Sequence, residues 1–298
     1  MAGVFSQVIE VAIEPERRTD LERLWVALEM LAAVDDRVGF AIDGETGPTV
    51  FKGGPDEDTV ASIIDRLRHN LNFKLTVGAP RVAYRETLGR KSEIDYTHKK
   101  QSGGSGQFAR IKLMFEPTNL GSGYSFESKI VGGSVPKEFI PGVEKGLEAS
   151  RRSGTLAGFP VIDFKATLID GAYHDVDSSE LAFEHAARCA FKDGLLRAQC
   201  KLLEPVMMVE VAVPFGFGKE VVADLDTRRA ERHLGVEIRR RAEVVRALVP
   251  LANMFGYANS LRMMTCGFGA YCMVFDHYGP VPKGPDDDSF GPSVGMRA

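Results

Sequence analysis

Apolar and polar positions alternate near the start of the chain and then change to a helical period. Ile9, Val11 and Ile13 share one face of a segment with the two-residue repeat of a strand. A helix follows at the sequence TDLE, where Thr19 is expected to cap and Glu22 to complete a capping box. The spacing then predicts an apolar stripe on the helix, formed by Leu21, Leu24, Trp25, Leu28, Leu31 and Ala32.

The following segments complete a βαββαβ order. VGFAID and TVFKG predict two short strands that are joined by the turn-rich residues 44–48. A second helix begins at Asp56, and FKLTV at 73–77 predicts the last strand. This order is typical of a ferredoxin-like split βαβ sandwich, with two helices on one face of an antiparallel sheet. The apolar face of the second helix comprises Val60, Ile63, Ile64, Leu67 and Leu71.

The same order returns at the other end of the chain without visible repetition of residues. VMMVEVAV predicts a strand, residues 218–233 a helix, and VEIRRR with VVRALVP a strand pair. MFGYANSLRMM is expected to form a short helix and AYCMVFDHY a last strand, which gives a second ferredoxin-like unit over about 205–282. The remaining KGPDDDSFGPSVGMRA is acidic and rich in Gly and Pro, so we expect a disordered tail.

A middle segment has a different pattern of long alternating strands. EIDYTHKKQ and QFARIKLMFEP predict two of them, a helix after Pro136 carries Phe139, Val143 and Leu147, VIDFKATLI predicts a third strand, and another helix follows from Ser178. The chain is therefore expected to be α+β with three domains. Two loops stand out in the middle segment, SGGSGQ at 102–107 and DGAYHDVDSS at 170–179.

Composition places the chain among soluble globular proteins, with 44% apolar and 26% charged residues in 298. No apolar run approaches the roughly 18 residues that span a bilayer, and the first residues lack the order of a signal peptide, so we expect a cytosolic protein. The cysteines show no CxxC spacing, which favours free thiols over zinc or disulfides; no function is assigned to Cys189, Cys200, Cys266 and Cys272.

The net charge of −4 argues against a protein that coats nucleic acid along its whole surface. Two basic stretches, RKSEIDYTHKK at 90–100 and RRAERHLGVEIRRR at 228–241, still permit a nucleic-acid partner. Such stretches are more often solvated faces than binding sites, so charge alone decides nothing here.

The two loops offer several chemical interpretations. SGGSGQ is no phosphate loop, because GxxxxGK[ST] does not occur in the chain, and a hairpin tip is the simpler interpretation. In DGAYHDVDSS, a hydrolase or a metal site would need groups from further elements. We expect instead that Asp177 or Ser178 caps the next helix and that Asp170-Gly171 makes the turn. His174 is left over, and an exposed position on the loop suits contact better than catalysis.

Five segments together closely resemble bacterial translation elongation factor G. They are THKKQSGGSGQFARIKLMFEP, KIVGGSVPKEFIPGVEKGL, AGFPVIDFKATLIDGAYHDVDSSELAF, LLEPVMMVEV and VPLANMFGYANSLR. By this resemblance, residues 1–84 are similar to its third domain, 85–204 to its fourth and 205–282 to its fifth, with a tail at 283–298. The fourth domain is then expected to have a ribosomal protein S5-type fold with a left-handed βαβ crossover, an exception to the usual handedness.

The resemblance implies a function without a catalytic or metal site in this chain. In the family, the tip of the fourth domain enters the decoding site of the small ribosomal subunit and follows tRNA and mRNA during translocation. The fifth domain lies near the GTPase-associated centre of the large subunit. GTP and Mg belong to a domain that is missing here, and a cytoplasmic monomer is expected. The implied tip residues are Gln101, Ser102, Gly103, Gly104, Ser105, Gly106, Gln107, His174, Asp175 and Val176, and the implied ribosome-facing basic residues are Lys99, Lys100, Arg228, Arg229, Arg232, Arg239, Arg240 and Arg241.

Departures from the family pattern leave alternatives open. The third domain commonly reads GELHLE where this chain has DEDTVA, the fifth GDLNxRRG where it has ADLDTRRA, and Ser105 replaces a frequent Arg. We therefore expect a divergent paralogue, present here as an expressed fragment or a natural truncation. The alternatives are a stand-alone ribosome-binding regulator and a part of a recycling or ribosomal-protection factor; a hydrolase centred on His174 has no convergent constellation to support it. The departing positions are Asp58, Thr59, Ser105, Asp226 and Ala230.

Overall fold

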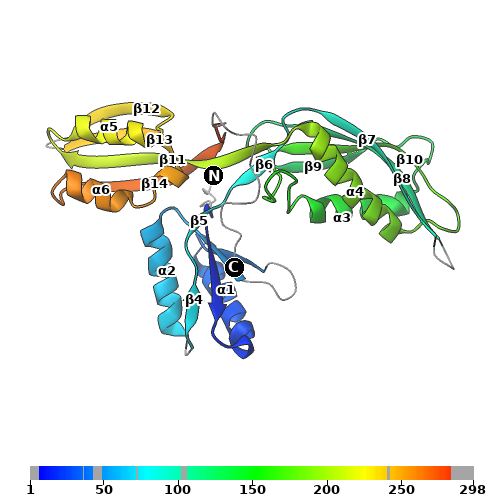
Figure 1. The fold of residues 1–298 in the computed structure, drawn as a ribbon, viewed down its shortest axis with the longest axis horizontal. Helices are drawn as coiled ribbons and strands as arrows, with labels where there is room; N and C mark the ends of the chain where they lie inside the picture. The colour runs from blue at the N-terminus through cyan, green and yellow to red at the C-terminus, as the bar shows by residue number, and fades with distance from the viewer. Residues whose placement is uncertain are drawn as a thin grey trace. The chain divides into compact units, whose positions relative to one another are not determined.

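The computed structural model describes residues 7–35, 37–42, 49–71, 73–101, 106–239 and 242–282. They form two compact units (Figure 1). The two-sheet unit contains the chain up to Ala83 together with Glu204–Gly279, and the one-sheet unit is built on Tyr84–Leu203. The fold is α+β, as expected, while the division into three domains stays a prediction. The expected tail, 283–298, lies outside the described residues.

The first sheet of the two-sheet unit has the strand order of a ferredoxin-like sandwich. Its order is β2-β3-β1-β4, and the neighbouring strands are antiparallel. Ile9, Val11 and Ile13 are buried on one face of β1, as are Leu24 and Leu28 of the first helix, so the two sequence periods predicted the core correctly. The elements are β1 (Ile9–Pro15), α1 (Leu21–Val34), β2 (Gly39–Ile42), β3 (Thr49–Gly53), α2 (Glu57–Asn70), β4 (Leu75–Val77) and β5 (Arg81–Val82), which also pairs with β1.

The second sheet repeats that order with unrelated residues. Its strands follow β12-β13-β11-β14, so the second predicted βαββαβ order is confirmed. Along β11 the alternate positions from Met207 to Val213 are buried, and those from Met207 to Val211 pair with buried positions of β13. The elements are β11 (Lys201–Pro214), α5 (Gly218–Thr227), β12 (Arg232–Arg239), β13 (Ala242–Pro250), α6 (Tyr257–Met264) and β14 (Ala270–Pro280).

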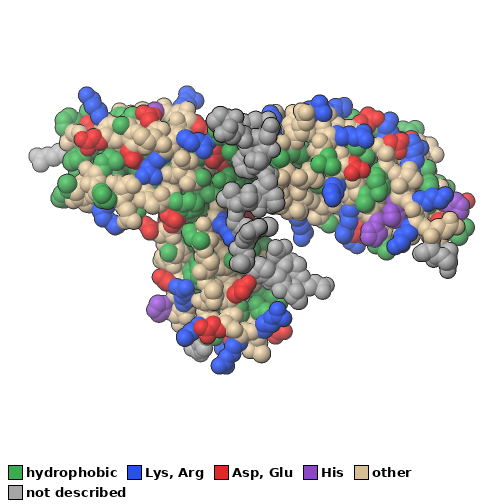
Figure 2. Space-filling view, in the orientation of Figure 1, with side chains coloured by type: hydrophobic (Ala, Val, Ile, Leu, Met, Phe, Trp, Pro, Cys, Tyr) green, Lys and Arg blue, Asp and Glu red, His purple; other side chains and the backbone are tan. Residues whose placement is uncertain are grey.

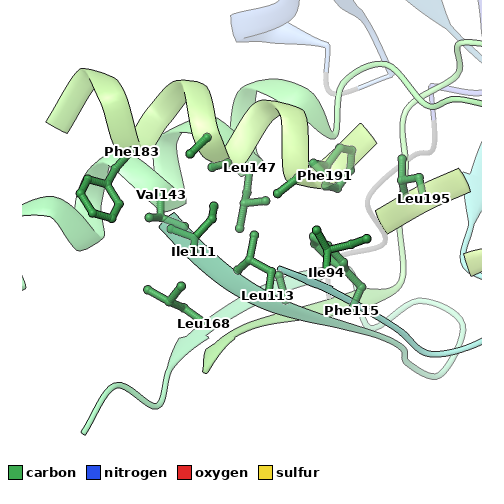
Figure 3. Close-up of a cluster of buried hydrophobic side chains, with 14 of the residues drawn as sticks. Ile94, Ile111, Leu113, Phe115, Val143, Leu147, Leu168, Phe183, Phe191 and Leu195 are labelled. Carbon is green, nitrogen blue, oxygen red and sulfur yellow. The ribbon is translucent and has the colours of Figure 1, made fainter. Parts of the chain in front are cut away.

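The one-sheet unit has a four-stranded sheet of order β7-β8-β10-β9. Strands β9 and β10 are parallel and are connected through α3, which makes a βαβ crossover whose hand stays a prediction. Figure 3 shows apolar side chains between the strands and the helices, including Val143 of α3, Phe183 of α4 and Ile111 of β8. The elements are β6 (Arg85–Thr87), β7 (Ser92–Lys100), β8 (Gln107–Pro117), β9 (Tyr124–Ser128), α3 (Ile140–Ser150), β10 (Phe164–Ala172) and α4 (Glu180–Ala198).

Two glycines allow α3 and α4 to pack closely. A Cβ atom at Gly142 would lie 2.4 Å from the carbonyl oxygen of Glu180, and one at Gly146 would lie 2.5 Å from that of Glu184. These positions are one turn apart on α3, so the glycine face of α3 lies directly against the backbone of α4. The close fit fixes the start of α4, and with it the loop that precedes the helix.

Two expected element boundaries are wrong. Thr19 is no cap, because it lies inside a 3-10 turn, Arg18–Asp20, that leads directly into α1 without a side-chain cap hydrogen bond. The helix expected over 218–233 ends at Thr227. The chain turns there because Arg229 adopts a positive φ of 65° and the Ala230 amide bonds back to the carbonyl oxygen of Leu225, after which β12 begins.

The local assignments in the loop before α4 also need correction. Ser179, and neither Asp177 nor Ser178, caps the helix, because its hydroxyl accepts the Ala182 amide at 3.2 Å. The expected turn at Asp170-Gly171 is instead part of β10, which continues past a bulge to Ala172. Asp177 and Ser178 are thereby released from capping and bond elsewhere.

Candidate functional site

Two loops far apart in the sequence meet at one end of the one-sheet unit. β8 starts at Gln107, and its neighbour β10 runs antiparallel to it and ends at Ala172, which pairs with Arg110. The β7–β8 hairpin and the β10–α4 loop therefore lie at the same end of the strands. We call this region the tip and define it by residues 99–101, 106–108 and 173–179. Figure 2 shows Lys, Arg and His side chains close together at this end of the unit.

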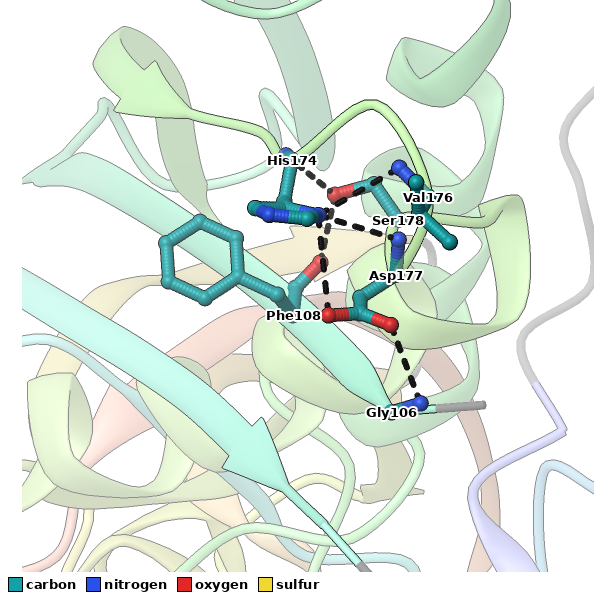
Figure 4. A network of polar contacts seen from close by, with 6 residues as sticks. All are labelled: Gly106, Phe108, His174, Val176, Asp177 and Ser178. Atoms are coloured by element: carbon teal, nitrogen blue, oxygen red, sulfur yellow. Dashed lines mark hydrogen bonds and ion pairs between the residues drawn. The ribbon is translucent and has the colours of Figure 1, made fainter. Parts of the chain in front are cut away.

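Asp177 joins the two loops through both its side chain and its backbone (Figure 4). Its Oδ1 accepts the Gly106 amide at 3.0 Å, and its carbonyl oxygen accepts the Phe108 amide at 2.8 Å. Next to it, Ser178 Oγ donates to the Phe108 carbonyl oxygen at 2.7 Å. Because these bonds tie three backbone groups of one loop to two residues of the other, the loops are positioned as one structure.

His174 projects from this junction with its side chain 57% exposed, as the sequence predicted. Its Nδ1 accepts the amides of Val176 and Asp177, both at 3.3 Å, and its own amide donates to Ser178 Oγ at 2.9 Å (Figure 4). An accepting Nδ1 carries no hydrogen, so this network assigns the hydrogen of the neutral ring to Nε2. The loop thus fixes one side of the imidazole and leaves a donor for an external partner.

The structure brings together most of the predicted tip residues that it describes. Lys99, Lys100 and Gln101 are exposed at the end of β7, and Asp175 is exposed beside His174. Val176 is 77% exposed, which is unusual for an apolar side chain and suits a contact surface. Gly106 and Gln107 lie at the start of β8. The other predicted residues of this loop, Ser102, Gly103, Gly104 and Ser105, lie outside the described residues.

Sequence reasoning missed three aromatic residues at or beside the tip. His98 on β7 and His185 on α4 lie with their ring centroids 5.9 Å apart and their planes at 27°. Tyr173 precedes His174 and is exposed. The two-residue period of β7 puts His98 on the helix-covered face together with Ile94, so the sequence could have predicted the face of His98. Its contact with His185 depends on how α4 packs, which no local sequence pattern predicts.

Arg228 does not face outward as expected. Its guanidinium bonds to Asp224 Oδ2, to the Asn253 carbonyl oxygen and to Ser260 Oγ, each at 2.8 Å, and lies 4.9 Å from the centre of the Tyr257 ring. Its side chain is only 17% exposed. These contacts connect α5 with α6, so Arg228 has a structural role in the two-sheet unit.

Arg229 is also tied to its own fold. Its Nη2 donates to Glu204 Oε1 at 2.6 Å, and Glu204 is almost fully buried. A buried carboxylate needs such a partner, because an unpaired charge there is costly. Of the remaining expected arginines, Arg232 is exposed, Arg239 ends β12, and Arg240 and Arg241 lie outside the described residues.

The described residues offer contact chemistry at the tip. In the part of the chain that the structure describes, no three His, Cys, Asp or Glu side chains converge as a metal site, and the four cysteines are free. No helix of the described residues is long and apolar enough to cross a membrane. The tip presents a ring donor, amides, two lysines and an apolar side chain, which can bind and position a partner.

Comparison with known families agrees with this architecture. Residues 80–199 match the family model for elongation factor G, domain IV, and residues 201–289 match the model for the elongation factor G C-terminus. The first match contains the whole tip, and the second contains the repeated ferredoxin-like order.

The chain is also similar to longer proteins and to a solved structure. The chain is 53% identical over 281 residues to elongation factor G from Paracoccus denitrificans (strain Pd 1222) and to that from Cereibacter sphaeroides (strain KD131 / KCTC 12085), covering 94% of this chain and 40% of each relative. The crystal structure of ttk003000868 from Thermus thermophilus matches with a TM-score of 0.71 at 39% identity, over 92% of this chain and 40% of that one. This chain therefore belongs to the elongation factor G family, of which it carries the part that spans domain IV and the C-terminal domain.

Proposed function

We propose that this chain is the ribosome-engaging part of an elongation factor G-like translational GTPase. In this role the tip of the one-sheet unit enters the decoding site of the small subunit and promotes the movement of tRNA and mRNA. The chain spans 40% of the length of its relatives, so GTP and Mg²⁺ are assigned to the part of a full-length protein that it does not span. No residue of this chain is proposed to hold them.

This proposal rests on the hydrogen bonds by which Asp177 joins the two tip loops. A probe that contacts RNA in a crowded site needs a fixed surface, because ordering a loop on binding costs free energy. Here the Gly106 and Phe108 amides are bonded to Asp177, and its own amide bonds to His174 Nδ1. The exposed ring of His174 and the exposed Gln101 then supply hydrogen-bonding groups that fit unpaired or bent RNA and do not require a particular base sequence.

The two-sheet unit contributes a smaller basic surface than the sequence suggested. Arg228 and Arg229 are engaged within the unit, whereas Arg232 is exposed and can meet a ribosomal phosphate. We therefore propose that contact with the large subunit depends on Arg232 and the end of β12, and that the tip gives the small subunit its main contact.

A chimaera tests the proposal. This chain would replace the matching part of elongation factor G from Paracoccus denitrificans, and ribosome-stimulated GTP hydrolysis and mRNA movement would be measured by rapid kinetics. We expect His174→Ala to slow mRNA movement by about tenfold, or about 1.4 kcal/mol of barrier, while GTP hydrolysis changes little. His69→Ala, an exposed histidine on α2 of the two-sheet unit, is the matched control.

Three outcomes would overturn the proposal. The chimaera could hydrolyse GTP on ribosomes without moving mRNA. His174→Ala could depress both activities equally. The chimaera could also split ribosomes without translocating, which would identify a recycling factor instead.

A further inference from the structure

A pair of stacked histidines lies beside the tip and outside both tip loops. His98 belongs to β7, the edge strand of the sheet, and His185 to the exposed side of α4. Their rings are 5.9 Å apart at 27°, an offset and nearly parallel arrangement. Since β7 has no neighbouring strand on its outer side among the described residues, the pair lies along an open edge that leads away from the tip.

The inner ring of this pair is held in place. His98 Nε2 donates to Gln107 Oε1 at 3.0 Å, and Gln107 is the first residue of β8. In the antiparallel register Gln107 pairs with Lys100, so His98, Lys100 and Gln107 share one face of the hairpin. The outer ring, His185, is exposed. A fixed ring beneath an exposed ring forms a flat platform that loses little entropy when a further ring stacks on it.

An unpaired cation accompanies the platform. Lys100 shares the face of His98, whereas Lys99 points to the opposite face of β7; both are exposed and form no ion pair among the described residues. Glu184 precedes His185, but its carboxylate is largely buried and pairs with Arg188 at 2.5 Å and Lys145 at 3.6 Å. The local charge therefore favours an anion.

The opposite face of the same sheet is different. There three cations are neutralised across neighbouring strands. The Arg110 guanidinium holds the pKa of Asp95 below its usual range. Lys112 Nζ lies 2.7 Å from Glu93, and Lys165 Nζ lies 2.5 Å from Glu127. Among the described basic residues of these strands, Lys99 and Lys100 are therefore the ones without an ion pair, and Lys100 lies on the face of the histidine platform.

We propose that His185, supported by His98, is a stacking site for an unpaired base of single-stranded RNA, with Lys100 contacting the adjacent phosphate. Flat rings beside a cation along an open edge suit a single strand, because every base offers a π-face and every linkage a negative charge. This inference rests on the proposed function and extends the RNA contact from the tip loops to the β7–α4 edge.

The test uses the full chain and a ten-nucleotide unpaired RNA that carries 2-aminopurine as a fluorescent base. Stacking quenches this fluorophore, and anisotropy of an end label gives the Kd. We expect His185→Ala to raise the Kd by about five- to tenfold and to abolish the quenching, whereas His185→Phe keeps both close to the parent values, because stacking does not require the imidazole nitrogens. Thr97→Ala is the matched control, since Thr97 is exposed on the opposite face of β7.

The result also separates this inference from the proposed function. Unchanged binding and quenching in His185→Ala, or no binding of the oligonucleotide by the parent chain, would overturn the stacking site even if His174→Ala still slows mRNA movement in the chimaera. Conversely, a chimaera that fails on ribosomes while His185→Ala still weakens RNA binding would reject the proposed function and leave the platform as an RNA site.

Discussion

At the scale of single residues, two residues of the same charge that lie close together in the sequence have different surroundings. Asp177 bonds to Gly106 of the adjacent loop and to His174 of its own, while Asp175, two positions earlier, is exposed and has no hydrogen bond or ion pair to another described residue. Arg229 is paired with a buried carboxylate, while the nearby Arg232 is exposed. Sequence composition treats the members of each pair alike, but the structure predicts opposite sensitivities.

Asp177→Ala should lower the free energy of unfolding by about 1 kcal/mol, because the Gly106 amide loses its acceptor on a partly exposed loop. Asp177→Asn should restore most of this, since an amide oxygen still accepts. Urea denaturation measures the loss, and hydrogen exchange at the Gly106 amide should accelerate only in the Ala variant. Asp175→Ala is the control; an equal effect there would show that Asp177 does not join the loops.

Arg229→Ala should destabilise the two-sheet unit by about 2 kcal/mol, because it leaves the carboxylate of Glu204 buried and unpaired. The cost lies below that of a fully buried pair, since the guanidinium is 41% exposed and solvent screens it. Adding Glu204→Gln should recover part of the loss in urea denaturation. Arg232→Ala should stay within about 0.5 kcal/mol, and equal losses for the two arginines would contradict the structural role of Arg229.

At the scale of elements, one buried carboxylate organises an irregular segment. Glu86 of β6 is fully buried, and its oxygens accept the amides of Leu156 at 3.0 Å, Ala157 at 2.8 Å and Phe159 at 3.1 Å. The segment 153–160 has no helix or long strand to satisfy these groups. The Glu86 carboxylate therefore supplies this segment with the hydrogen-bond acceptors that a neighbouring strand would supply at a sheet edge.

Glu86→Ala should destabilise the one-sheet unit by about 3 kcal/mol, because three partly buried amides would lose their acceptor together. Limited trypsin digestion should then cut faster after the exposed Arg152, which directly precedes this segment. Glu86→Gln should give an intermediate rate, since one acceptor oxygen remains. Glu93→Ala on the open sheet face is the control. A digestion rate that Glu86→Ala leaves unchanged would mean that the segment is held by other contacts.

Sequence patterns predicted the order of elements better than their ends. Both βαββαβ orders followed from local periods, because each face of a strand or helix is recorded in its own residues. The helix expected to reach 233 stopped at Thr227 because Arg228 bonds to α6 and Arg229 turns the chain, and these are tertiary contacts. The tip loops were found by composition and resemblance. Their joining by Asp177 could not be predicted, because it depends on the antiparallel register of β8 and β10.

At the scale of the whole molecule, the chain carries two sheets of one topology and a third of another, and belongs to a family whose members are longer. No GxxxxGK[ST] segment occurs in it to cradle a nucleotide phosphate. We expect calorimetric titration of this chain with GTP or GDP to give no binding tighter than about 1 mM. Full-length elongation factor G from Paracoccus denitrificans is the positive control, and micromolar affinity in this chain would contradict the assignment.

The cross-strand ion pairs on the face of the β7-β8-β10-β9 sheet opposite the histidine pair have a thermodynamic consequence. Their lysines and arginines already pair with carboxylates. They are therefore not free to neutralise RNA phosphates and release the counterions bound to those phosphates. Although the chain contains 37 Lys and Arg residues, the compensated ones on this face should not register in the ionic-strength dependence of RNA affinity. The logarithm of the association constant should therefore fall against that of the salt concentration with a slope of about −2 to −3, as three or four phosphate contacts to a single strand require. A slope steeper than about −6, measured by anisotropy from low to moderate salt, would mean that the paired face opens its ion pairs to bind.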